Sequence, residues 1–247
     1  MKADPFAQLK LLDVQELDSR ADQLRHAKAN LPELAQIAAL DTERRGIEDQ
    51  ARDVRIVVDD LATAQRKAEA DVAAVRTRRD RDQQRLDSGA VTSPKDLESI
   101  QHEIVNLDRR ITVLEDEELE VMERLEEEQG RLTALEDALA GFDERLATLL
   151  SRRDQRTAEL DAELAALVAE RPGTIEELPA DLLALYDRLR EQRGGVGAAE
   201  LRQRRCGGCQ LELDNAELLR IKALPSTEVA RCEECSRILV RTAESGL

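Results

Sequence analysis

Two runs of apolar residues that repeat every seven positions flank a short segment containing glycine and proline, and this pattern constrains the fold most. The runs lie within residues 31–87 and 94–170. A sustained seven-residue repeat predicts a helix with an apolar seam that supercoils with a partner helix. Folding about residue 91 brings Leu86 near Leu97, Leu61 near Val121 and Leu40 near Phe142, so the two series of seam residues match in length. The sequence therefore predicts an antiparallel coiled-coil hairpin within one chain, with its tip at residues 88–93.

The seam positions are occupied mainly by leucine, isoleucine and valine. In the first run they are Leu40, Ile47, Val54, Leu61, Ala68 and Val75, with Ala51, Val58, Val72 and Leu86. In the second run they are Leu97, Ile104, Ile111, Leu125, Leu132, Leu139 and Leu146, with Ile100, Leu107, Leu114, Val121, Leu135, Phe142 and Leu149. The interruptions are Arg44, Gln65, Arg79, Glu118 and Glu128. Polar seam residues can set the register of a coiled coil at a cost in stability. They can equally lie at a tolerated exposed edge, which is the interpretation we favour.

Two further helices are predicted, at residues 5–28 and 179–193. In the first of them the expected apolar stripe consists of Leu9, Leu12, Leu17, Leu24 and Leu31. This stripe has only the base of the hairpin, near residues 145–190, to pack against. A capping-type break at Asn30-Leu31-Pro32-Glu33 separates this helix from the hairpin.

Two proline- and glycine-containing segments mark the end of the helical part. Arg171-Pro172-Gly173 is expected to end the long helix near residue 170, because proline lacks the amide hydrogen that a helix interior requires. The cluster Gly194-Gly195-Val196-Gly197 predicts a helix stop and a candidate hinge. We therefore expect a helical domain at residues 1–193 and a second domain at residues 198–247.

The composition favours helices over an ordinary globular core. Aromatic residues make up 1% of the chain, tryptophan is absent and charged residues reach 36%. Large aromatic side chains usually dominate core energetics, so a thick layered core is not expected. No stretch approaches the ~20 apolar residues that span a bilayer. The first ten residues also lack the layout of a signal peptide, so we expect a cytoplasmic protein without a membrane partner.

All four cysteines lie near the C-terminus, in two C-x-x-C pairs 22 residues apart. They are Cys206, Cys209, Cys232 and Cys235. Paired cysteines of this kind supply the four thiolates of a tetrahedral zinc site. The alternatives are disulfides or a redox dithiol, but a redox C-x-x-C motif stands beside a βαβ pattern, which is absent here. The sequence thus predicts one structural Zn²⁺ in a small β-rich zinc ribbon.

Within this predicted ribbon the local pattern indicates three short elements. Residues 210–213 and 237–241 are expected to form strands, and residues 215–223 a helix capped by Asp214. The fold class is accordingly mainly α, an elongated antiparallel coiled-coil hairpin with a small C-terminal zinc ribbon.

The formal net charge of −16 is unevenly distributed. Residues 194–247 hold eight acidic and eight basic side chains, so the whole excess lies in the helical part. Any contact with a polyanion therefore needs a local cationic patch. The residues expected to form one are Arg202, Arg204, Arg205, Lys222, Arg237 and Arg241, with Arg220 and Arg231 nearby. Ordinary surface charge is the alternative explanation of this group.

Nothing in the sequence predicts catalysis. His26 and His102 have no cysteine or serine arranged beside them as a nucleophile. The acidic runs Glu115–Glu118 and Glu126–Glu128 fit a solvated helix face, and no phosphate-binding glycine motif is present. A zinc ion with four protein thiolates leaves no position for a reacting water. We expect a protein that is not an enzyme and has no small-molecule substrate.

Several segments resemble the motifs of one bacterial family with a long coiled coil and a C-terminal C4-type zinc ribbon. They are the tip at residues 89–98, the following residues 101–104, the segment Leu182–Tyr186 and both cysteine pairs. The resemblance covers essentially the whole chain. It implies a hook-shaped hairpin with the ribbon at its base, and it assigns the zinc ligands to the four cysteines. One departure is Ser236, where the family usually has glycine.

The resemblance also implies an adaptor or nucleic-acid-binding role, because relatives are connected with flagellar or type III secretion, messenger RNA or an alternative sigma factor. Shared architecture alone does not transfer such roles. Our first hypothesis is a zinc-binding adaptor whose ribbon binds RNA, DNA or the transcription machinery. The alternative is a protein scaffold or chaperone that uses the hairpin, with a purely structural ribbon and a transcription or secretion protein as its partner.

Overall fold

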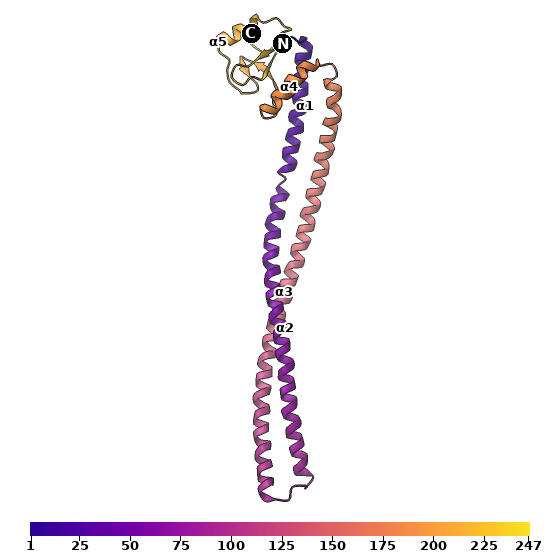
Figure 1. Ribbon diagram of the computed structural model, residues 1–247, viewed down its shortest axis with the longest axis vertical. Helices are drawn as coiled ribbons and strands as arrows, with labels where there is room; N and C mark the ends of the chain where they lie inside the picture. The colour runs from indigo at the N-terminus through magenta and orange to yellow at the C-terminus, as the bar shows by residue number, and fades with distance from the viewer. The chain divides into compact units, whose positions relative to one another are not determined.

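The computed structural model describes residues 1–247, which form five helices and one four-stranded sheet (Figure 1). The elements are α1 Pro5–Ala29, α2 Pro32–Asp87, α3 Pro94–Ile175, α4 Ala180–Gln192, β1 Ala198–Arg202, β2 Arg205–Cys206, α5 Asn215–Ala223, β3 Ala230–Arg231 and β4 Ile238–Arg241. They divide into two compact units. One comprises Met1–Leu34 with Ser151–Leu247, and the other comprises Ala35–Leu150. No helix combines the length and the apolar character that crossing a membrane requires.

The second unit is the predicted coiled-coil hairpin. Its α2 and α3 segments run side by side in opposite directions and wind about each other (Figure 1). The buried apolar side chains of this unit all belong to the predicted seams: Ala51, Val54, Leu61, Val72, Ile104, Leu107, Leu114 and Leu125. The predicted fold class is confirmed.

Two arginines that interrupt the first seam reach across the hairpin. Arg44 Nε donates to Asp143 Oδ1 at 2.7 Å, and Arg79 Nε donates to Asp108 Oδ1 at 3.1 Å. Arg55 forms a further ion pair between the helices, with Glu136 at 2.5 Å. The pairs of Arg44 and Arg79 are solvent-exposed, as expected for these two residues at an exposed edge of the seam, and each joins one position of α2 to one of α3.

The helix α3 continues past Pro172 to Ile175 instead of ending near residue 170. Contacts with other elements hold this last turn. Arg171 forms ion pairs with Asp18 and Asp187, and Ile175 packs against the core of the first unit. These contacts offset the hydrogen bond that proline removes from the helix.

The buried face of α1 differs from the predicted leucine stripe. Leu11 and Val14 are fully buried, whereas Leu9 is 40% exposed. Gln15 and Asp18 are buried on the same face as Leu11 and Val14. Of the predicted stripe, Leu31 is buried and Leu12 packs against the core, but the most buried residues of α1 lie on a face that also includes polar side chains with partners in the fold.

The sheet has the strand order β2-β1-β4-β3. The central strands β1 and β4 are parallel, and the outer strands β2 and β3 pair antiparallel with them. The sequence predicted the position of β4 closely but missed β1, whose Ala198-Ala199 start follows the glycine cluster. Residues 210–213 contribute only an isolated bridge between Glu212 and Arg205 instead of a strand.

The ribbon and the helices of the first unit share one core. Most of its buried residues come from α1, α4, β1 and β4, including Leu11, Tyr186, Ile238 and Val240, and Ala3 and Leu178 precede α1 and α4. The N-terminal residues also pair with the ribbon, since Ala3 N donates to Thr227 O at 2.7 Å and Val229 N donates to Met1 O at 3.0 Å. The compact unit thus extends across the domain boundary expected near residue 194.

The glycine cluster between α4 and β1 is held from both sides. Gly194 and Gly195 have φ angles of +67° and +89°, which explains the choice of glycine. A Cβ atom at Gly197 would lie 2.5 Å from Tyr186 O, so α4 and the cluster are in close contact. Gln15 donates to Gly195 O at 2.8 Å and accepts from Gly197 N at 2.7 Å. The cluster thus forms a corner that contacts both α1 and α4.

Candidate metal centre and binding surface

The two cysteine pairs meet at one point of the ribbon. Their four Sγ atoms all lie within 4.8 Å of one another. Cys206 and Cys235 are 3.7 Å apart, and Cys209 and Cys232 are 3.9 Å apart, measured between Sγ atoms. A tetrahedral zinc ion with Zn–S bonds of about 2.3 Å requires neighbouring sulfur atoms about 3.8 Å apart. The predicted ligand set therefore fits one structural Zn²⁺ with closed coordination.

Each knuckle is closed by the same backbone hydrogen bond. Gln210 N donates to Cys206 O at 2.8 Å, and Ser236 N donates to Cys232 O at 2.8 Å. Both Gln210 and Ser236 have a φ of +62°, in the left-handed region that favours glycine. Ser236 thus adopts the conformation expected of the glycine that the family usually has there.

Burial and hydrogen bonds shift the thiol pKa values in opposite directions. Burial raises the pKa of Cys206 far above its ordinary value and raises that of Cys232 to about 11. Burial alone would also raise the pKa of Cys235, but hydrogen bonds from Arg237 and from neighbouring thiols lower it to about 7. Four thiolates this close together repel one another, so a divalent cation is needed to stabilise all of them at once.

Arg237 connects the first knuckle with the corner after α4. Its guanidinium donates to Val196 O at 2.9 Å and to Arg193 O at 2.6 Å. Its side chain crosses Gly208 so closely that a Cβ there would lie 2.5 Å from Arg237 Cδ. The cation of Arg237 is consequently bound to backbone carbonyls within the unit.

The side chain of Arg241 also binds backbone groups of the ribbon. Its guanidinium donates to five backbone carbonyl oxygens, those of Ile221, Leu224, Pro225, Ser226 and Glu228, at distances from 2.8 to 3.4 Å. These carbonyls belong to the end of α5 and the loop that follows it. Arg241 thereby holds the loop that precedes the second knuckle.

The other predicted cations lie on the exposed surface of the ribbon. Arg202 pairs with Glu244 at 2.8 Å, and Arg205 approaches Glu212 at 4.0 Å. Arg204 and Lys222 are brought together in one groove, where the guanidinium of Arg204 donates to the neutral side chain of Asn215. The structure thus separates the six predicted residues into two that hold the backbone and four that face solvent.

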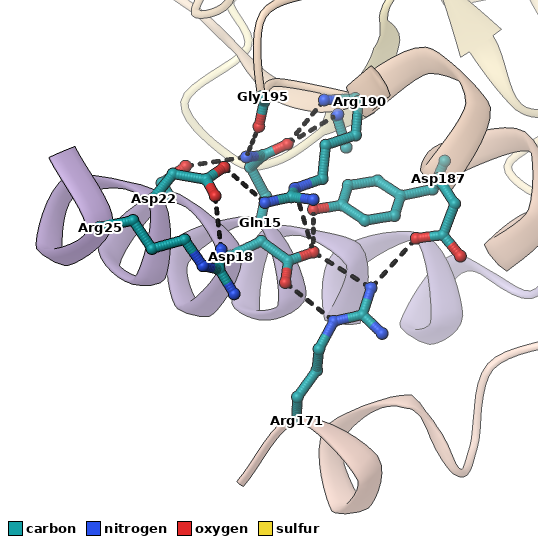
Figure 2. Close-up of polar contacts among 12 residues, drawn as sticks. Gln15, Asp18, Asp22, Arg25, Arg171, Asp187, Arg190 and Gly195 are labelled. Carbon is teal, nitrogen blue, oxygen red and sulfur yellow. Dashed lines mark hydrogen bonds and ion pairs between the residues drawn. The ribbon is translucent and has the colours of Figure 1, made fainter. Parts of the chain in front are cut away.

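A cluster of polar side chains in the same unit was missed by the sequence reasoning (Figure 2). The carboxylate of Asp18, on α1, accepts from Arg171 Nε at 2.8 Å and from the Tyr186 hydroxyl at 2.9 Å. Arg190 Nε lies 3.4 Å from the same carboxylate. Asp18 therefore joins α1, α3 and α4 at a buried point.

The groups around Asp18 stabilise its ionised form. Burial alone would raise its pKa, but hydrogen bonds from Arg171 and Tyr186 and the charges of Arg171 and Arg190 lower the pKa below its ordinary value. Burial and the negative charge of Asp18 in turn raise the pKa of Tyr186. The helical spacing of the apolar residues Ala7, Leu11 and Val14 marked this face in the sequence, but no local pattern showed that Gln15 and Asp18 are buried on it.

Both histidines are exposed on their helices. The Asn30 side chain lies 3.3 Å from His26 Nδ1, and His26 borders a shallow hollow beside Gly194 and Gly195. His102 lies on α3 near the tip. No hydrogen bond joins either ring to a cysteine or serine side chain, although Ser19 lines the same hollow as His26.

Comparisons with known proteins agree with both parts of the fold. Residues 14–194 match the family described as the CT398-like coiled coil hairpin domain, and residues 205–239 match the C4-type zinc ribbon domain. The uncharacterized protein Rv2229c of Mycobacterium tuberculosis is 37% identical over 241 residues, which is 98% of each chain. An uncharacterized protein of Mycobacterium leprae, ML1638, is 32% identical and covers 90% of this chain and 95% of its own.

Solved structures show the same architecture. A Mycobacterium smegmatis protein superimposes with a TM-score of 0.88 and 33% identity, covering 98% of this chain and 100% of that one. CT398 from Chlamydia trachomatis gives a TM-score of 0.70 at 17% identity, covering 96% and 98%. At that identity the likeness extends to the fold alone.

Proposed function

The chain belongs to the family of CT398-like coiled-coil hairpin proteins with a C4-type zinc ribbon, and from this premise we propose that it is a non-enzymatic, zinc-dependent adaptor. In this proposal the ribbon binds nucleic acid or a protein of the transcription machinery. Four thiolates close the zinc coordination, so the ion stabilises the fold and offers no position to a substrate.

The observation that carries the proposal is the exposed cationic face of the ribbon. Arg202, Arg204, Arg205 and Lys222 present their side chains to solvent around β1, β2 and α5. The whole excess of negative charge lies in residues 1–193, outside the ribbon. A partner that is itself anionic is therefore attracted to this face and repelled by the rest of the surface.

A matched charge variant tests the proposal. Arg202, Arg204, Arg205 and Lys222 are replaced together by glutamine, and Arg237 and Arg241 are left intact because they hold the backbone. Lysate proteins and nucleic acids captured by each form are compared with and without nuclease. We expect the wild type, and not the variant, to retain nuclease-sensitive material or a transcription protein.

Filter binding with single-stranded RNA then measures the charge contribution. If all four cations contact phosphates, the logarithm of the RNA affinity falls with the logarithm of the salt concentration with a slope of about −3. The affinity then falls about fiftyfold between 50 and 200 mM salt. Equal capture by both forms, together with RNA binding that is weaker than micromolar and flat in salt, would contradict a role for this face.

The scaffold hypothesis is favoured by one separate observation on the hairpin. Leu119 and Met122 are 55% and 41% exposed on α3, among the acidic residues of that segment. Replacing both with serine removes this apolar surface and leaves the ribbon untouched. Loss of a captured protein in this variant alone would assign binding to the hairpin.

A further inference from the structure

A groove on the ribbon lies between α5, the turn that connects β1 to β2, and the last residues of the chain. Its volume is about 270 Å³. Leu218, Leu219 and Leu247 provide its apolar surface, and Arg204 and Lys222 provide its charge. The groove thus combines apolar contact area with two cations.

Leu219 is the most unusual of the apolar residues in the groove. Its side chain is 67% exposed, whereas the neighbouring Leu218 is 7% exposed and belongs to the ribbon core. Lys222 follows Leu219 by three positions, so both lie on the same face of α5. This face therefore presents a leucine and a cation that the ribbon core does not use.

Arg204 occupies a position that the backbone geometry does not favour for arginine. Gln203 and Arg204 form the two-residue turn between β1 and β2, with φ angles of +48° and +66°. Turns with two positive φ angles usually contain asparagine or glycine, because other side chains are strained there. Strained residues are found preferentially at functional sites. The arginine at this turn is thus better explained by its charge than by the fold.

The two cations of the groove have no acidic side chain as a partner. No Asp or Glu side chain forms an ion pair with Arg204 or Lys222, in contrast to Arg202 and Arg205, which each have a glutamate nearby. Their charges are therefore available to a ligand. The residues that line the groove include no aromatic side chain on which a nucleic-acid base could stack.

We propose that this groove docks an acidic protein segment that presents one large apolar side chain. The apolar side chain packs against Leu219 and Leu218, and flanking carboxylates pair with Arg204 and Lys222. The inference rests on the proposed function, in which the ribbon is the binding end of an adaptor. It specifies a protein segment, and not nucleic acid, as the partner of this part of the surface.

Peptide display on the zinc-loaded full chain tests the proposal. A random library of 12-residue peptides is selected on the wild type, with counter-selection on the Leu219→Ser variant. We expect a consensus with one large apolar residue between aspartates or glutamates. A synthetic peptide of that consensus should lose at least tenfold in affinity on Leu219→Ser, Arg204→Asn and Lys222→Gln, and less than twofold on the control Arg202→Gln.

Arg204→Asn separates binding from folding. Asparagine tolerates a positive φ better than arginine, so the thermal midpoint of this variant should equal or exceed that of the wild type. A loss of peptide binding without a loss of stability would therefore reflect the charge of Arg204. Leu219→Ser should also fold normally, because the side chain that it removes is mostly exposed.

Three results would overturn the proposal. A selection without an acidic, apolar consensus is one, and a selected peptide that binds all groove variants like the wild type is another. The third is self-association in sedimentation that Leu219→Ser abolishes, since this would assign the groove to a second copy of the chain. RNA retention in the filter assay is independent, so it can persist when the groove proposal fails and can fail when peptide binding succeeds.

Discussion

Replacing Asp18 with asparagine should destabilise the unit that contains the zinc ribbon. The Asp18 side chain is 8% exposed and faces Arg171 and Arg190, whose side chains are 29% and 25% exposed. Breaking a fully buried ion pair costs about 3–5 kcal/mol. Because both arginines keep part of their solvation and asparagine keeps an oxygen acceptor, we expect a loss of about 2–3 kcal/mol in the free energy of unfolding.

Tyr186 provides the assay for this loss. It is the only tyrosine of a chain without tryptophan, and its hydroxyl donates to Asp18. Tyrosine fluorescence during urea unfolding therefore reports on this cluster alone. Asp187→Asn is the matched control, because Asp187 also pairs with Arg171 at 3.0 Å but its side chain is 51% exposed. An exposed pair of this kind contributes about 0–1 kcal/mol.

The effect of Asp18→Asn should also depend on pH. The folded protein lowers the pKa of Asp18, so its stabilisation is complete above the unfolded pKa of about 3.9 and is lost as pH falls through the folded pKa. The wild type and the variant should thus converge in acid. A loss below about 0.5 kcal/mol at neutral pH, or an equal loss in Asp187→Asn, would refute the reasoning.

Three further results are expected. Chelation of zinc should remove hydrogen-exchange protection from the ribbon and from residues 1–8, which bond to it, and leave the hairpin helices protected; protection that persists in the ribbon would contradict a structural ion. In urea titrations, Gly197→Ala should lower the free energy of unfolding by more than about 2 kcal/mol, because the added Cβ would clash with backbone atoms. Gly46→Ala should raise it by about 0.5–1 kcal/mol, because Gly46 lies on an open helix surface. In thermal unfolding, Arg241→Lys should lower the free energy of unfolding by about 1–3 kcal/mol, because Arg241 donates to backbone carbonyls. Arg202→Gln should lower it by less than about 0.5 kcal/mol, because the ion pair of Arg202 with Glu244 is exposed.

The hairpin and the zinc ligands could be predicted because their signals are local. The seam recurs every seven residues whatever the helix packs against, and the two cysteine pairs define a ligand set by spacing alone. The break between α1 and α2 was also visible, because Asn30 and Pro32 act on their own backbone. In each case the sequence nearby contains all the chemistry that decides the structure.

The buried face of α1 and the strand β1 could not be predicted in this way. Gln15 and Asp18 are polar, and their burial is favourable only because groups about 150 or more residues away satisfy them. The alanines that begin β1 have little intrinsic preference for strands, and their pairing with β4 decides the outcome. Both features depend on partners that no local pattern identifies.

The basic residues of the ribbon show why a charge count alone does not define a binding surface. Arg237 and Arg241 were grouped with Arg204 and Lys222 in the sequence, yet their guanidinium groups donate to backbone carbonyls of the same compact unit. A variant lacking Arg241 would therefore lose binding through loss of structure. Arg204 and Lys222 have no such role, so their charge can be removed with the fold intact, and binding experiments on these two residues measure recognition directly.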